Sequence, residues 1–301
     1  MKLRNTSSLA SAAVSDWNNL TILNISSVSS GEETYSFAAN SGNTGWGGLA
    51  SITNYSGCTI LRATAQLNTY YSWTTNGARG VFCQEIGHTF GLDHSNDGGC
   101  MGGGYWYDIS THYSLVSHNV NDIGTMYANR TAIRPSIFGP EADAPRFHAY
   151  WRNNPTSLQA ATRLASEIVV ATVTDVAEGD AIETVYADGV QRIPTQRVSF
   201  DVQGSRKGSL ATGESFVLFQ NGNAANRFDE DPSYEMGQSY LLFMTQREDG
   251  TYLVVSPAGR YEVSPRGLVP AIEKGFAGEL KGASLRDVLS DVTRSLEIEK
   301  Q

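Results

Sequence analysis

The chain has few cysteines, few basic residues and no long apolar run, and each shortage narrows what it can be. Only three of its 301 residues are cysteine and five are histidine. Lysine and arginine number 22 against 31 acidic residues, so the formal net charge is −9. No basic cluster stands out, so we expect no nucleic-acid partner. No stretch of about 18 apolar residues occurs, so the sequence predicts no transmembrane helix.

The three cysteines are Cys58, Cys83 and Cys100. None of them belongs to a Cys-x-x-Cys pattern, which argues against a zinc ribbon and against a dithiol redox site. On spacing alone they can be three buried thiols of a protein that works in a reducing compartment.

The most specific pattern present runs from Gln84 to His94 and reads Gln-Glu-Ile-Gly-His-Thr-Phe-Gly-Leu-Asp-His. Zinc hydrolases place two histidines four residues apart on one helix face, with a glutamate next to the first as general base. Here Glu85 and His88 fill two of those positions, while Gln84 stands where the first histidine is expected. Gly91 can adopt the left-handed conformation that ends a helix. The chain can then turn and bring His94 back toward His88.

This segment resembles the extended zinc-binding signature of the metzincin proteases, most nearly the matrixin-like branch and its bacterial relatives. The resemblance implies a zinc-dependent endopeptidase that hydrolyses extracellular polypeptides. Glu85 then corresponds to the catalytic general base, and His88 and His94 to the second and third Zn²⁺ ligands. Gln84 falls on the position of the first ligand and departs from the family pattern.

Weaker matches extend the resemblance over roughly residues 5–130. They are a first helix, a loop and a strand before the metal helix, a methionine turn and a final helix, at Ala12–Asn18, Gly45–Ala50, Gln66–Tyr71, Cys100-Met101 and Asn121–Tyr127. If the methionine turn lies beneath the metal helix as in that family, Cys83 and Cys100 come within bridging range. The resemblance therefore implies a Cys83–Cys100 disulfide and leaves Cys58 unpaired and buried.

Gln84 leaves three outcomes open. Zinc prefers nitrogen and sulfur donors, and the glutamine amide offers a neutral oxygen. Zinc can bind weakly through His88, His94 and Gln84, or it can bind through the two histidines with lower occupancy. In the third outcome the site is empty, and the chain is a catalytically silent pseudoenzyme that acts as a protein-binding module.

The remaining polar residues near the motif are given no catalytic role. His112 and His118 fall in the loop that would border the substrate pocket, and we expect them to be solvated. His148 falls in a proline-containing stretch and is expected to be unrelated to the site. Asp93 flanks the third ligand and can order a water or a backbone group.

The N-terminus bears on where the protein works. Residues 1–8 have no apolar core and are not a signal peptide. The strand that precedes the first helix in the family has no counterpart in the sequence, so we expect a truncated chain whose export signal is missing. Five glycosylation sequons fit a secreted, extracellular protein, at Asn5, Asn19, Asn24, Asn54 and Asn129.

Composition changes along the chain predict an α+β protein with two domains. Residues 1–130 form a metzincin-like domain with a mixed sheet and an active-site helix, and residues 131–159 form a linker with four prolines. In the first domain we expect strands at Leu20–Ser26, Thr34–Ala39 and Thr59–Leu67, and helices at Ala78–Phe90 and Asp122–Ala128.

The sequence pattern of residues 160–301 predicts a small antiparallel β-barrel, followed by a C-terminal helix that begins at Ser284. Its expected strands are Glu167–Asp175, Arg197–Gln203, Glu214–Gln220, Ser239–Thr245 and Thr251–Ser256. The pattern is similar in outline to OB-like netrin-type modules and to the tissue inhibitors of metalloproteases. That likeness implies a protein partner for the barrel.

Overall fold

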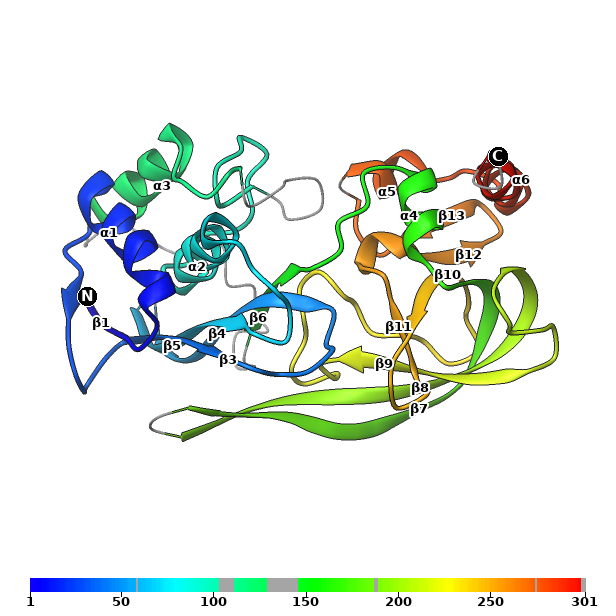
Figure 1. Ribbon diagram of the computed structural model, residues 1–301, viewed down its shortest axis with the longest axis horizontal. Coiled ribbons are helices and arrows are strands. Elements are labelled where there is room, and N and C mark those ends of the chain that lie inside the picture. Colours follow the sequence, from blue (N-terminus) through cyan, green and yellow to red (C-terminus); the bar gives the residue numbers. More distant parts are fainter. Residues whose placement is uncertain (58, 103–110, 129–145, 187–188, 274, 299–301) are drawn as a thin grey trace. The chain divides into compact units, whose positions relative to one another are not determined.

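The computed structural model describes residues 1–57, 59–102, 111–128, 146–186, 189–273 and 275–298. The chain divides into two compact units (Figure 1). The first unit comprises Met1–Gly42, Trp46–Trp151 and Glu183–Gln191, and the second comprises Asn43–Gly45, Arg152–Ile182 and Arg192–Gln301. Each unit contains one mixed sheet and several helices, which confirms the predicted α+β class.

Within the described residues, the sheet of the first unit has six strands in the order β2-β1-β3-β5-β4-β6. Their bounds in that order are Ser26–Ser27, Lys2–Asn5, Thr34–Ala39, Thr59–Asn68, Trp46–Ser56 and Arg146–Trp151. The first four strands of that order run parallel to one another, and β4 runs antiparallel to both of its neighbours, β5 and β6.

The helix α2 (Thr75–Thr89) is the centre of this unit (Figure 1). It packs against β5, β4 and β6 and against α1 (Ser11–Leu20), and all of its residues from Gly77 to Thr89 except Arg79 are buried. The Trp17 indole donates a hydrogen bond to the Cys83 carbonyl at 2.9 Å, and Arg79 forms an ion pair with Asp16 at 2.6 Å. Both contacts fix α1 on α2. A third helix, α3, spans Ser117–Ala128.

Several predicted elements of this unit are confirmed, and others are wrong. The strand over Thr34–Ala39 and the helix over Ala78–Phe90 are present as β3 and α2. The strand predicted over Leu20–Ser26 is wrong, because α1 continues to Leu20 and only Ser26 belongs to a strand. The expectation that no strand precedes the first helix is also wrong, since β1 lies there.

Two further expectations need correction. The segment Gly45–Ala50, read as a loop, lies almost wholly in β4, which starts at Trp46. Part of the predicted linker, Arg146–Trp151, is β6 and belongs to the sheet. The rest of the linker up to residue 145, together with Cys58 and Asn129, lies outside the described residues.

In the second unit, the five strands predicted from sequence are present as β7 to β11. Their bounds are Glu167–Tyr186, Gly189–Lys207, Ser215–Asn221, Ser239–Gln246 and Tyr252–Val254. Because β11 pairs with both β9 and β10, these strands form a closed ring in the order β7-β8-β9-β11-β10. The β9–β11 pair is parallel, so the ring is mixed and the prediction of an all-antiparallel barrel is wrong. Two more strands, β12 (Arg260–Ser264) and β13 (Gly267–Pro270), extend the sheet from β10.

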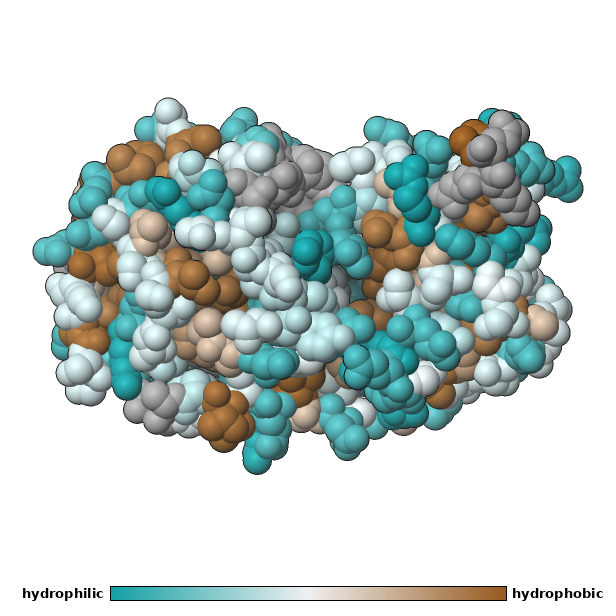
Figure 2. Space-filling model, viewed as in Figure 1, coloured by the Kyte–Doolittle hydropathy of each residue, from teal (hydrophilic) through white to brown (hydrophobic). Residues whose placement is uncertain are grey.

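Among the described residues, the second unit also contains the α-helices α4 (Leu158–Leu164), α5 (Gly275–Glu279) and α6 (Leu285–Ile298). The Ser284 hydroxyl accepts a hydrogen bond from the Asp287 amide at 3.1 Å, so Ser284 caps α6 as predicted. No described helix is both long enough and apolar enough to cross a membrane. On the face drawn in Figure 2, hydrophobic residues stand among polar ones.

A buried ion pair lies in the core of the second unit. Arg260 contacts Asp231 at 3.0 Å, and both side chains are almost fully buried. The same guanidinium lies 3.5 Å from the centroid of the Tyr234 ring and donates to the carbonyls of Pro232 and Ser233. Burial raises the pKa of Asp231, and the adjacent Arg260 acts against that rise. The carboxylate is thus held in the core by its partner.

Candidate functional site

The end of α2 brings two histidines of the sequence motif together. The Thr74 hydroxyl caps the start of the helix by accepting from the Gly77 amide at 3.0 Å. At the other end Gly91 has φ +89°, and its amide donates to the His88 carbonyl at 2.9 Å. This left-handed turn reverses the chain, as the sequence predicts. His94 therefore returns to His88.

The ring nitrogens of the two histidines face each other. His88 Nε2 lies 3.0 Å from His94 Nε2. His88 Nδ1 lies 2.7 Å from the Leu92 carbonyl oxygen, which can only accept, so Nδ1 carries the proton. In neutral His88, Nε2 is therefore the unprotonated nitrogen, and its lone pair points toward His94. Metal-binding histidines characteristically hold their second nitrogen against a carbonyl or carboxylate in this way.

The surroundings of His88 favour its neutral form. The side chain is 1% exposed. Burial is the main reason that the pKa of His88 lies well below its usual value, and the nearby His148 and His94 lower it further. A neutral imidazole is the form that binds metal ions. The arrangement can thus offer a donor nitrogen at ordinary pH.

Glu85 is on the same helix, and its carboxylate lies against the sheet. The residue is fully buried. A Cβ atom placed on Gly48 of β4 would come within 2.4 Å of Glu85 Oε1. Glycine at position 48 is thus what allows the carboxylate to pack onto the strand backbone. The sequence motif alone does not reveal this contact, because residues 48 and 85 are far apart in the chain.

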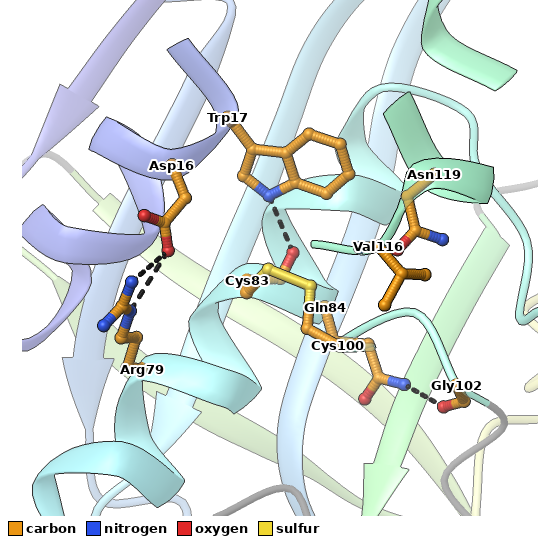
Figure 3. Close-up of a disulfide and its surroundings, with 9 residues drawn as sticks. All are labelled: Asp16, Trp17, Arg79, Cys83, Gln84, Cys100, Gly102, Val116 and Asn119. Carbon is orange, nitrogen blue, oxygen red and sulfur yellow. Dashed lines mark hydrogen bonds and ion pairs between the residues drawn. A yellow bond between two sulfur atoms is a disulfide. The ribbon is translucent and has the colours of Figure 1, made fainter. Parts of the chain in front are cut away.

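The two polar atoms of the Gln84 side-chain amide have different surroundings. Its Nε2 donates to the Gly102 carbonyl at 3.1 Å (Figure 3). Its Oε1 is buried and accepts no hydrogen bond from the described residues. A buried oxygen without a donor is costly unless a proton donor or a cation satisfies it. The amide oxygen at this position is therefore available as a ligand.

The predicted disulfide Cys83–Cys100 is present, with 5.8 Å between the Cα atoms (Figure 3). It ties the turn that contains Met101 to α2. A Cβ atom on Gly87 would come within 2.3 Å of the Met101 sulfur, so the methionine packs directly against the helix backbone. This turn and its disulfide hold α2 from the side opposite the sheet contact of Glu85.

His148 also belongs to this cluster, and its expected separation from the site is wrong. Its ring is stacked on the His88 ring, with 4.5 Å between centroids and 11° between the planes. The ring of His94 lies 6.2 Å away. Residue 148 is in β6, where it is the register partner of Ala50 in β4. A strand pairing between segments about a hundred residues apart left no signal in the local sequence.

The other two histidines are exposed, as the sequence predicts. His112 contacts the neighbouring Thr111 at 2.9 Å. His118 at the start of α3 lies 3.3 Å from Asp97 and 3.0 Å from Asp122. Asp93 accepts a hydrogen bond from the His94 amide at 2.7 Å, which orders the turn that carries His94.

The donor set fits a metal ion in part. Two bonds of about 2.0–2.1 Å at a tetrahedral angle separate their donor atoms by about 3.3 Å, close to the spacing of the two Nε2 atoms. Among the described residues, no three histidine, cysteine, aspartate or glutamate side chains are arranged to hold a metal ion. The buried Oε1 of Gln84, which accepts no hydrogen bond from the described residues, is a donor of a type outside that set. No protein-family model and no curated protein matches this chain.

Proposed function

We propose that this chain is a metzincin-like zinc endopeptidase that hydrolyses peptide bonds of extracellular proteins. His88 and His94 are the nitrogen ligands, and the amide oxygen of Gln84 is a weaker third ligand. When bound by these residues, zinc would act as a Lewis acid that polarises the carbonyl of the peptide bond to be cleaved. The Glu85 carboxylate takes a proton from the attacking water and passes it to the leaving amine.

The orientation of His88 carries this proposal. The Leu92 carbonyl holds the proton on Nδ1, so the lone pair of Nε2 points to His94 Nε2 at 3.0 Å. The separation of these two nitrogens is close to that of two ligands bound to one tetrahedral zinc ion. Glu85 follows Gln84 on the same helix, and its side chain is buried like that of His88.

One observation supports a silent alternative. The amide of Gln84 is engaged by the Gly102 carbonyl, and an amide oxygen is a poorer zinc donor than the imidazole of the family pattern. In that case the first unit is a pseudoenzyme that keeps the fold in order to bind other proteins. The two alternatives differ in zinc content and in turnover.

The proposal extends to the second unit and to the compartment. The closed strand ring with a parallel β9–β11 pair supports an OB-like module similar to netrin domains and metalloprotease inhibitors, with a protein partner. The Cys83–Cys100 disulfide supports a protein that works outside the cytosol, because such bonds persist in oxidising compartments.

Zinc titration of the purified chain tests the proposal. We expect one zinc per chain, and we expect His88→Ala and His94→Ala each to weaken binding strongly. The matched control is His112→Ala, which removes an exposed imidazole and should leave zinc affinity unchanged.

Hydrolysis of an unfolded polypeptide is the second measurement. Glu85→Gln should retain zinc while losing turnover by about 10²–10⁴-fold, the usual contribution of a general base. Zinc without turnover, both in the wild-type chain and in variants that loosen the strands around the site, would favour the pseudoenzyme. No zinc at either histidine would exclude both the metal site and the hydrolysis.

A further inference from the structure

The strand β6 occupies the edge of the sheet that borders the candidate site. It pairs antiparallel with β4 along the register Trp46↔Trp151 to Ile52↔Arg146. The opposite edge of β4 is taken by β5. Gly48, which touches the Glu85 carboxylate, is the register partner of Tyr150. The backbone of β4 next to Glu85 is therefore paired on both sides.

The side chains of β6 also cover the site. Successive residues of a strand point to opposite faces, so His148 and Tyr150 share one face of the sheet. His148 stacks on the His88 ring, and Tyr150 is buried in the core formed with α2. The face of His88 that meets His148 is closed to any other group while β6 is paired.

An extended polypeptide usually binds to a sheet by adding a strand to a free edge, where main-chain hydrogen bonds hold it. Such a substrate could place its peptide bond near Glu85 and His88 by pairing with β4. In the structure that pairing is already made by the chain itself. Substrate and β6 thus compete for the same backbone groups.

We propose that β6 is an autoinhibitory strand, which holds the polypeptide-binding edge of β4 until it is released. This inference rests on the proposed function and adds its regulation. Only the fraction of molecules in which β6 has left β4 can bind substrate, so apparent affinity is reduced by that fraction. Phe147 and Trp151 are 3% and 1% exposed, so β6 is well anchored and that fraction is small.

Weakening the anchor should activate the protein. Phe147 points to the face of the sheet opposite His148, so Phe147→Ala loosens β6 without touching the histidine cluster. We expect turnover of an unfolded polypeptide to rise about tenfold or more, in proportion to the open fraction. The matched control is Phe37→Ala in β3, a strand that does not flank β4. Phe37 is 2% exposed and stacks on Tyr186, so it is equally buried outside the α2 core.

Locking the strand should have the opposite effect. Leu49 and Ala149 are register partners, and directly opposed antiparallel residues have Cα atoms about 4.5–5.5 Å apart, which a disulfide can bridge. In oxidised Leu49→Cys/Ala149→Cys we expect turnover at least about tenfold below that of the single variant Leu49→Cys, a change of about 1.4 kcal/mol. Zinc binding should be the same in both.

A binding measurement keeps the test independent of catalysis. A fluorescent peptide with the sequence of residues 146–151 is added to each variant in a Glu85→Gln background. We expect it to bind Phe147→Ala, and to bind neither the locked variant nor Phe37→Ala. Equal peptide binding by all variants, or measurable turnover that is equal in Phe147→Ala and Phe37→Ala, would overturn the autoinhibitory strand. Peptide binding as expected but with no zinc and no turnover would instead refute only the proposed hydrolysis.

Discussion

Removal of the Cys83–Cys100 disulfide gives the sharpest test of how α2 is held. The two cysteines are 17 residues apart in the sequence. In the chain-entropy treatment, opening a loop of that length costs about 10 cal/mol/K, or about 3 kcal/mol at 25 °C. For a unit of this size that loss lowers the melting temperature by about 6–12 °C. We therefore expect Cys83→Ser/Cys100→Ser to unfold at a clearly lower temperature than the wild type.

The assay is thermal and urea denaturation followed by circular dichroism, with and without a reductant. Reductant should lower the stability of the wild type to that of the double variant and leave the double variant unchanged. This comparison removes any effect of the serine side chains. A wild-type transition that does not move with reductant would mean that the bond contributes no stability. The turn at Met101 would then be held by packing alone.

Three other changes follow from particular contacts. Gly48→Ala forces a Cβ into the side chains of α2, so we expect it to lower the free energy of unfolding by about 1–3 kcal/mol and to reduce turnover. Gly124→Ala in α3 meets open space and should instead raise the free energy of unfolding by about 0.5–1 kcal/mol in the same urea titration. Gln84→His replaces an oxygen donor by a nitrogen donor and should raise zinc affinity in a competition titration, and an unchanged affinity would mean that residue 84 does not face the metal. Asp231→Ala leaves the buried Arg260 without its carboxylate partner and should lower the free energy of unfolding by about 3–5 kcal/mol. Glu273→Ala, at an exposed ion pair, should lower it by less than about 1 kcal/mol. Equal losses in the two variants would show that burial of the ion pair does not decide its contribution to stability.

The parts that sequence could predict are those with a local signal. The helix α2 has a capping threonine, a terminal glycine and a motif with fixed spacing, so its existence, its end and the approach of His94 to His88 all follow from neighbouring residues. The strands β7 to β11 were found because β-branched and aromatic runs alternate with turn residues. The disulfide came from the family resemblance.

The parts that sequence missed depend on pairings between distant residues. The strand β6 follows a proline-containing stretch, and its pairing with β4 places His148 on His88, 60 positions away in the sequence. The contact of Gly48 with Glu85 likewise joins a strand to a helix. The strand β1 was also missed, because its four residues, Lys2–Asn5, are too few for a periodic pattern.

The close contacts of α2 at Gly48 and Gly87 limit which substitutions the fold can accept. At Gly48 and Gly87 any other residue brings a Cβ into the side chain of Glu85 or Met101, so a substitution at either position requires the neighbouring side chains to shift. Position 84 differs, because its side chain is fully buried but ends at a carbonyl, that of Gly102, and not at a glycine backbone. In the proposed metal site, an exchange of the residue at position 84 therefore changes the metal chemistry while the two glycine contacts remain. The outline of the site can outlast its activity.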